Sequence, residues 1–494
     1  MSRSRTSVLS LVLLVPLLSS CTGAAPSPSQ KQSRSAPSPT GHSHTPAEPG
    51  EHADVYPDRI TLTWAEDPAS SLSVSWRTDT SVTAPVAEIA PATPASSFYT
   101  NARTVQATTH PLDIAGVDPD SVHAPYHYHS VTFSNLGADS TYAYRVGDGT
   151  HWSEWFHAMT ASDQAEPFSF IYLGDAQNNL RSHWSRAIRA AYSADPDAAF
   201  MVHVGDLVNG ADRNVEWARW HQAGDWIQST IPTLPVPGNR EYANRDSSWT
   251  LPDGSVSETP TTGRQLSAHW RPQFALPQNG PKGLTERVYV IDHQGLRLIG
   301  VDPMAAFADS VNLPRQTQWL ESVLSDNDQR WTAVAIHIPV FSTVGDFEGL
   351  REAWKPLFDE YQVDLVMQGH NHTYARGQVR NQSAGNTPHR SGRGTVYVTS
   401  VAGAKMMEIK DGRWSSYEDI ELDRGGENTQ LFQVVRVSRD TLKYRAYTVM
   451  GDRYDAFDLV KRPGPEPNEL IDRVPAEEAE RTYDNTIPYD RPKQ

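Results

Sequence analysis

The sequence has a single cysteine and few basic side chains for its length of 494 residues. One cysteine excludes a disulfide framework and a metal site built from several thiolates. Lysine and arginine total 43 against 59 acidic residues, a net charge of −16. This balance argues against a protein that coats nucleic acid, because that function needs a dominant basic surface. A mean hydropathy of −0.55 also excludes a polytopic membrane protein.

The first 21 residues have the pattern of a bacterial lipoprotein signal peptide. Arg3 and Arg5 precede an apolar run over residues 8–18, which is too short to span a bilayer. The run ends in Leu-Ser-Ser-Cys, similar to a lipobox, in which Cys21 becomes the lipidated first residue of the mature chain. An ordinary signal peptide with an incidental cysteine is the alternative. Both predict an exported protein, and the lipobox predicts one anchored at the bacterial cell surface or the periplasmic side of the membrane.

After this segment the chain divides into four stretches of different composition. Residues 22–54 are rich in proline and serine, which predicts an extended linker. Residues 55–161 contain short runs of alternating apolar and polar side chains, which predict a β-sandwich. In residues 166–460, continuous apolar runs alternate with amphipathic stretches, which predicts an α/β domain with strands buried on both faces. Residues 461–494 are charged and rich in proline, so we expect an extended tail.

Polar residues follow five of the apolar runs in the predicted α/β domain. They are Gly174-Asp175-Ala176-Gln177, Gly205-Asp206, Gly238-Asn239-Arg240-Glu241, His337 and Gly369-His370-Asn371-His372. Because ligands of open α/β sheets bind at the carboxyl ends of strands, these residues are expected to converge. Carboxylate, amide and imidazole groups together favour Fe, Mn, Zn or Mg. Six or seven such groups exceed the needs of one ion and predict two ions that share a carboxylate, a centre suited to displacement at phosphorus.

The ordered set Gly-Asp, Gly-Asp, Gly-Asn, His and Gly-His-x-His resembles the calcineurin-like metallophosphoesterase superfamily and, within it, the purple acid phosphatases. The resemblance covers about residues 56–461. It implies a fibronectin-III-like N-terminal domain and a four-layer αββα catalytic domain with two mixed sheets. The activity it implies is hydrolysis of a small phosphorylated substrate, most often a monoester, as in acid phosphatases. A phosphodiesterase on the same metal core, and a surface binding protein with a degenerate site, are the alternatives.

The resemblance also implies a division of the ligands between two ions, with Fe, Mn or Zn as the expected metals. Asp206 would bridge both ions, Asp175 and His372 would bind the first, and Asn239, His337 and His370 would bind the second. Gln177 stands where related phosphoesterases often have a histidine. Its amide oxygen would either bind the first ion or make a hydrogen bond beside it.

Two residues depart from the purple acid phosphatase pattern. Asn209 replaces the tyrosine whose phenolate binds ferric iron, so we expect a protein that is not purple and a first site less committed to iron. Arg240 replaces a histidine that helps to bind phosphate. Arginine stays charged and is a poor general acid, but it can hold a phosphate through two donors. The alternative for Arg240 is a salt bridge that turns it away, for example to Glu241.

Overall fold

The computed structural model describes residues 50–114, 118, 125–244, 264–308, 310–380, 394–462 and 468–474. The predicted signal peptide with Cys21, most of the linker and most of the tail lie outside these ranges. In the parts of the chain that are described, every helix is too short or too polar to span a lipid bilayer.

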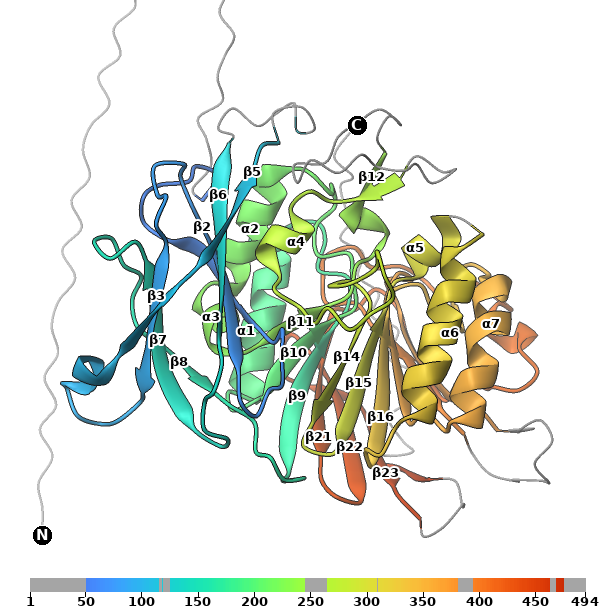
Figure 1. Cartoon of the computed structure of the whole chain (residues 1–494). Helices are drawn as coiled ribbons and strands as arrows, with labels where there is room; N and C mark the ends of the chain where they lie inside the picture. The colour runs from blue at the N-terminus through green and yellow to red at the C-terminus, as the bar shows by residue number, and fades with distance from the viewer. Residues whose placement is uncertain are drawn as a thin grey trace, which may run out of the picture. The chain divides into compact units, whose positions relative to one another are not determined.

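The N-terminal region is a sandwich of two four-stranded antiparallel sheets, as the alternating pattern predicts (Figure 1). One sheet has the order β1-β2-β6-β5 and the other β4-β3-β7-β8. The bounds are β1 (Asp58–Thr63), β2 (Leu72–Thr78), β3 (Val86–Pro91), β4 (Arg103–Gln106), β5 (Thr108–Leu112), β6 (Tyr126–Phe133), β7 (Thr141–Gly147) and β8 (Phe156–Met159), with a 3-10 turn η1 (Phe98–Asn101).

Strand β2 departs from the expected half-buried pattern, because every residue in it is buried. Helix α4 (Trp270–Gln273) contacts β2 and β6 of the same sheet. The hydroxyl of Thr63 donates to the carbonyl of Ala275 over 2.7 Å. The sheet therefore packs on the α/β domain with the face that a lone sandwich would expose to water.

The α/β domain contains two seven-stranded mixed sheets. The first sheet has the order β11-β10-β9-β21-β22-β23-β24, and the second has the order β14-β15-β16-β17-β19-β18-β20. The first sheet consists of β9 (Phe168–Leu173), β10 (Phe200–His203), β11 (Thr233–Pro235), β21 (Leu431–Val437), β22 (Thr441–Thr448), β23 (Arg453–Val460) and β24 (Glu469–Asp472). The second consists of β14 (Tyr289–His293), β15 (Leu296–Val301), β16 (Trp331–Ile336), β17 (Leu365–Gln368), β18 (Tyr374–Gln378), β19 (Val396–Thr399) and β20 (Arg424–Gly426). A separate hairpin pairs β12 (Tyr242–Asn244) with β13 (Arg264–Leu266).

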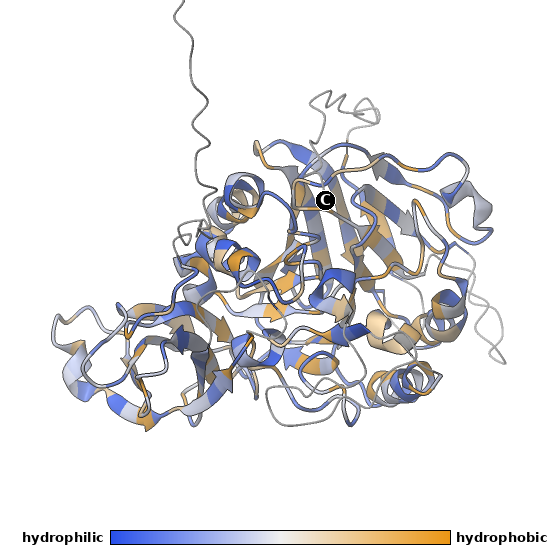
Figure 2. Cartoon of the chain, turned by 90° about the horizontal axis from the view of Figure 1, so that it is seen from above, coloured by the Kyte–Doolittle hydropathy of each residue, from blue (hydrophilic) through white to orange (hydrophobic). Residues whose placement is uncertain are grey.

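Helices cover the outer faces of the two sheets, which makes the four-layer αββα arrangement (Figure 1). Figure 1 shows α1 and α2 beside the first sheet, and α6 and α7 beside the second. Seen from above, hydrophobic and hydrophilic residues alternate along the helices and strands (Figure 2). The helices are α1 (Ser185–Ala194), α2 (Asn214–Gly224), α3 (Trp226–Thr230), α5 (Pro303–Ala308), α6 (Asn312–Ser325) and α7 (Glu348–Glu360), with shorter turns η2 (Leu180–Trp184), η3 (Asn239–Glu241) and η4 (Trp414–Ser416).

The apolar runs expected to be buried strands form β9, β10, β15, β16 and β17, and their side chains are almost all buried. Strand β24 was not expected from the sequence. It continues the first sheet beyond residue 460, where an extended tail was predicted. Its residues pair with β23, and Arg473 just after it donates to the carboxylate of Asp458 over 2.8 Å. Part of the charged segment is therefore ordered by charge pairing with the sheet.

Candidate metal centre

The loops that follow β9, β10, β11, β16 and β17 meet at one end of the two sheets. They bring together all seven residues that the sequence suggests as ligands. Oxygen and nitrogen atoms of Asp175, Asp206 and His337 all lie within 4.8 Å of one another, and these three side chains are buried. The first sheet supplies Asp175 and Asp206, and the second supplies His337. The cluster therefore spans the interface between the sheets.

Asp206 lies between two groups of side chains, one near each of its carboxylate oxygens. Oδ1 is 3.3 Å from Nε2 of His337. Oδ2 is 2.7 Å from the side-chain nitrogen of Gln177. This placement is what a bridging carboxylate requires.

Asn239 completes the group on the Oδ1 side of Asp206. Its side-chain oxygen is 3.1 Å from Nε2 of His337 and 2.9 Å from Nδ1 of His370. The side chains of Asn239, His337 and His370 therefore bring three potential ligand atoms together beside Asp206. They are the residues that the resemblance assigns to the second ion.

His372 and Asp175 lie on the Oδ2 side with Gln177. Nε2 of His372 is 3.0 Å from the side-chain nitrogen of Gln177 and 3.7 Å from Oδ1 of Asp175. The backbone N–H of His370 donates to both oxygens of Asp175, over 3.0 and 2.8 Å, and so fixes this carboxylate. This group matches the set assigned to the first ion.

Backbone carbonyls orient two of the imidazole rings. Nδ1 of His337 lies 2.8 Å from the carbonyl oxygen of Val204, and Nδ1 of His372 lies 2.7 Å from that of Lys405. A carbonyl only accepts, so Nδ1 carries the hydrogen in both rings. Nε2 then carries the lone pair, which faces the cluster in both rings, as in metal-binding histidines.

Four of the predicted ligands have left-handed backbone conformations, which are strained for residues other than glycine. The φ angles are 37° at Asp175, 52° at Asp206, 72° at His370 and 54° at His372. The backbone is also crowded at Gly205, where an added Cβ would lie only 2.7 Å from both Gly238 Cα and His337 Nδ1. Strain concentrated at these positions is typical of a functional site that the rest of the fold supports.

Burial sets the protonation of the cluster. Desolvation, and then the charge of Asp206, raise the pKa of Asp175, and desolvation raises the pKa of Asp206. Desolvation lowers the pKa of His337 and His370 to about 3, so both rings are neutral. Buried carboxylates beside neutral imidazoles call for a cation.

The side chain of Gln177 also fits a metal site. The side-chain oxygen of Gln177 is buried and has no hydrogen-bond partner. A rotation of the amide by 180° would exchange its nitrogen and oxygen, which crystallographic practice assigns from the surroundings. The oxygen would then point between Asp206 and His372, in position to bind a cation.

Glu241 holds together the two loops that carry Asp206 and Asn239. Its Oε2 accepts the backbone N–H groups of Asp206 and Gly238 over 2.8 and 2.7 Å. Its Oε1 accepts those of Leu207 and Val208 over 2.8 and 3.3 Å. Burial and the charge of Asp206 raise the pKa of Glu241, and these N–H donors act against that rise. All of its carboxylate is thus committed to the backbone.

Two family models match the chain in tandem. Residues 57–160 match the purple acid phosphatase N-terminal domain, and residues 168–374 match the calcineurin-like phosphoesterase model. The two matches together cover more than half of the chain, and the second includes every predicted ligand. Residues 168–374 are a calcineurin-like phosphoesterase domain. The domain order of the chain is that of the purple acid phosphatases, and a dinuclear metal centre, typical of this family, fits the buried cluster.

The relatives of this phosphoesterase are distant. It is 27% identical over 277 residues to an uncharacterized protein of Mycobacterium tuberculosis, a match that covers 49% of both chains. It is 24% identical over 318 residues to purple acid phosphatase 23 of Arabidopsis thaliana, covering 57% of this chain and 63% of the relative. The chain thus spans about half to just under two thirds of the length of these curated relatives.

Two solved structures share the fold of this phosphoesterase. A purple acid phosphatase from yellow lupin (Lupinus luteus) seeds superposes with a TM-score of 0.64 at 18% identity, covering 83% of this chain and 75% of that chain. PhoD superposes with a TM-score of 0.57 at 11% identity, covering 89% and 95%. At such identities the likeness establishes the architecture alone.

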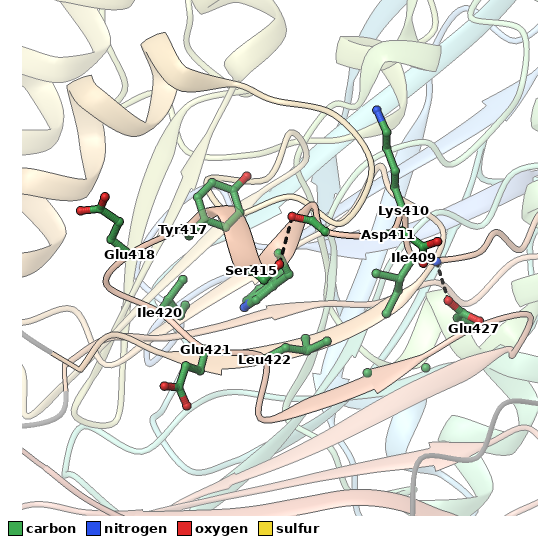
Figure 3. A pocket seen from close by; sticks show the side chains of 14 residues that line it. Ile409, Lys410, Asp411, Ser415, Tyr417, Glu418, Ile420, Glu421, Leu422 and Glu427 are labelled. Atoms are coloured by element: carbon green, nitrogen blue, oxygen red, sulfur yellow. Dashed lines mark hydrogen bonds between the residues drawn. The ribbon is translucent and has the colours of Figure 1, made fainter.

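A pocket of about 570 Å³ lies beside edge strand β20 of the phosphoesterase domain (Figure 3). The backbone N–H of Ile409 donates to the Glu427 carboxylate at its edge over 2.8 Å. Asp411, Glu418 and Glu421 also line it, against the single cation Lys410, and it contains no predicted ligand. This acidic lining does not suit phosphate.

Lys405 and Phe347 belong to the surroundings of the centre, and sequence reasoning did not identify them. The carbonyl of Lys405 fixes His372, and its positive charge acts on Asp175, His337 and His370. The ring of Phe347 packs on His370. Neither residue follows a strand within a ligand motif, so spacing along the chain carried no signal for them.

Gln177 can be tested as a ligand. Because its amide lies between Asp206 and His372, we expect Gln177→Ala to lower the affinity for one of two ions by about 10- to 100-fold. Gln177→His should keep both. The measurement is metal content after equilibrium dialysis against decreasing free metal. Gln433→Ala, which removes another buried amide of the first sheet, is the control, and wild-type metal affinity in Gln177→Ala would contradict ligation.

Proposed function

We propose that the protein is a metal-dependent phosphoesterase that hydrolyses phosphate monoesters, with an acid phosphatase-like activity. The observation that supports this most is the position of Asp206, with one oxygen toward Asn239, His337 and His370 and the other toward Asp175, Gln177 and His372. Asp206 would hold two ions, and these groups would hold one each. When bound, the ions would make water acidic enough to act as a nucleophile and would neutralise charge on the phosphoryl oxygens.

We propose that Arg240 binds a phosphate oxygen. Its backbone N–H donates to Oδ1 of Asp206 over 2.8 Å, so the side chain starts beside the proposed bridge. Within the described residues, no carboxylate lies at salt-bridge distance from its guanidinium. Glu241, the alternative partner, is held by four backbone N–H groups instead. The half-buried guanidinium can therefore offer its paired donors to substrate.

The deciding experiment is metal analysis of the purified protein combined with a substrate panel. We expect about two metal ions per chain, and faster hydrolysis of p-nitrophenyl phosphate than of its bis ester. Faster hydrolysis of the bis ester would favour the phosphodiesterase alternative. A protein that binds no Fe, Mn or Zn and hydrolyses neither ester would favour the degenerate binding protein.

The metals at the two sites stay a prediction, with Fe, Mn and Zn as the proposed candidates. Asn209 has no phenolate, so a visible charge-transfer band is not expected. A strong visible band in metal-replete protein that disappears on reduction would contradict this.

Replacing Arg240 by histidine tests the leaving-group step. Histidine can give a proton to a departing alkoxide, whereas arginine stays charged and cannot. We expect Arg240→His to raise the rate on an alkyl phosphate relative to p-nitrophenyl phosphate by about tenfold or more. Arg240→Lys, which keeps the charge and is also a poor acid, should leave this ratio near the wild-type value. If the two variants show the same ratio, the assignment of a missing general acid at position 240 is wrong.

The location of the protein is also proposed from its sequence. We suggest export and a lipid anchor on Cys21, with residues 22–54 as a linker to a fibronectin-III-like sandwich. Replacing Cys21 by serine should move the protein from the membrane fraction to the soluble fraction. A wild-type protein that takes up no labelled fatty acid would contradict the anchor.

A further inference from the structure

A row of four aromatic rings leads from the proposed second metal site to the surface. The rings of His337 and His370 are 5.2 Å apart, and Phe347 follows at 5.4 Å from His370 with its plane tilted by 73°. Phe307 follows at 6.4 Å from Phe347. His337 is completely buried, whereas Phe307 is 42% exposed. The row therefore connects the interior of the centre with solvent.

The outer two rings belong to the helical layer of the domain, whereas the two histidines follow strands. Phe307 lies in the short helix α5, and Phe347 directly precedes α7. Val311, four residues after Phe307, is 55% exposed. Large apolar side chains left in water are unfavourable, and Phe307 is joined through Phe347 to a predicted ligand, which a single exposed residue would not be.

The inner end of the row has the opposite character. The positive charges of Lys405 and Arg240 both lower the pKa of His370 and His337, so two cationic side chains act on the proposed second ion site. The backbone holds Lys405 there, because Gly403 donates to the carbonyl of Asp175 over 2.9 Å and Lys405 accepts from His372. Two positive side chains thus act on the buried end of the row, beside the carboxylates that would hold the ions, and the open end is aromatic.

A ligand that matches this gradient has an anionic head and a flat apolar body. We propose that Phe347 and Phe307 form a subsite for the leaving group, and that the preferred substrates are phosphate monoesters of aromatic alcohols. This inference rests on the proposed phosphoesterase function. His370 would direct the ester toward the two phenylalanine rings, because the Phe347 ring lies edge-on to its imidazole, 5.4 Å away. Aromatic contacts of this kind favour offset or edge-on stacking.

The subsite can be tested by binding, without hydrolysis. The probes are methylphosphonate and naphthylmethylphosphonate, which share the anionic head and cannot be hydrolysed as esters. We expect the wild-type, metal-loaded protein to bind the naphthyl probe at least about tenfold more tightly, measured by titration calorimetry. Phe307→Ala and Phe347→Leu should each reduce this ratio by about threefold or more. Phe307→Tyr, which keeps a ring, should keep most of it.

Trp226→Ala is the matched control, since Trp226 is an aromatic residue with similar exposure, 43%, on α3. It should leave the ratio of the two affinities unchanged. Metal content is measured for each variant, so that damage to the centre is separated from loss of the subsite. Equal affinity of wild-type protein for the two probes, or an unchanged ratio in both phenylalanine variants, would overturn the inference.

A kinetic measurement separates the inference from the proposed function. Phenyl and naphthyl phosphates have leaving groups of similar acidity but different ring area. Hydrolysis of both with no preference in KM would leave the function in place and remove the subsite. Tight, ring-dependent binding of the phosphonate without hydrolysis of any monoester would support the subsite and remove the function.

Discussion

Replacing Asp206 by asparagine is expected to reduce phosphoester hydrolysis by at least about a thousandfold. Asp206 is the one side chain with an oxygen in each half of the cluster, so the substitution removes negative charge from both proposed ion sites at once. Hydrolysis of p-nitrophenyl phosphate gives the rate. Metal analysis of the same sample should show loss of at least one ion per chain.

Asp302→Asn is the control for this substitution. Asp302 is also a buried carboxylate, but it accepts hydrogen bonds from Tyr242 and Ala305 and lies 3.6 Å from Arg287 rather than beside a predicted ligand. This variant should keep its metals and a rate within about tenfold of the wild type. Wild-type turnover in Asp206→Asn would refute the dinuclear assignment.

Replacing Glu241 by glutamine is expected to have the second largest effect. Each carboxylate oxygen of Glu241 accepts two backbone N–H groups, so either orientation of the amide turns an NH2 group toward two other donors. Buried donors left unsatisfied cost about 1–3 kcal/mol each, so we expect a loss of about 2–4 kcal/mol in the free energy of unfolding. Because these donors belong to the loops of Asp206 and Asn239, metal affinity should also fall by about 10- to 100-fold. Urea unfolding and metal titration measure the two effects.

Glu216→Gln provides a matched control for Glu241→Gln. A single oxygen of Glu216 accepts the N–H groups of Asn209 and Gly210, over 2.6 and 3.0 Å. The oxygen of an amide can replace that oxygen and keep both bonds. We expect a change in unfolding free energy below about 1 kcal/mol, together with wild-type metal affinity. Equal effects of the two substitutions would show that the pairing of donors around Glu241 does not support the centre.

The sequence was sufficient to predict the two domains and the residues that meet at the centre. Each predicted ligand directly follows an apolar run, and parallel strands place such positions at one edge of a sheet. The double burial of β2 was not predictable, because it depends on contact with residues that lie about 200 positions away. Strand β24 was also missed, since it is held by pairing with β23 and not by an apolar pattern of its own.

The contacts around the ligands could not be predicted from the sequence, for a similar reason. Glu241 is visible in the Gly-Asn-Arg-Glu motif, but its four backbone partners come from two loops separated by about 30 residues. The placement of Phe347 beside His370 depends on the path of the chain between β16 and α7. Positive φ angles at Asp175, Asp206, His370 and His372 follow from tertiary packing, because aspartate and histidine do not require them by themselves.

The order of strands in the first sheet has a consequence for when metal can be acquired. Strand β9, which leads into Asp175, pairs on one side with β10 and on the other with β21, so its second neighbour is synthesised more than 250 residues later. The loop that fixes His372 is likewise joined to Gly174 and Asp175 through Ala402 and Gly403. A chain still growing on the ribosome therefore lacks the strand and the loop that position Asp175 and His372 until translation is almost finished. Since the choice among similar divalent ions depends on which are available where folding ends, the compartment of folding would help to select the metals.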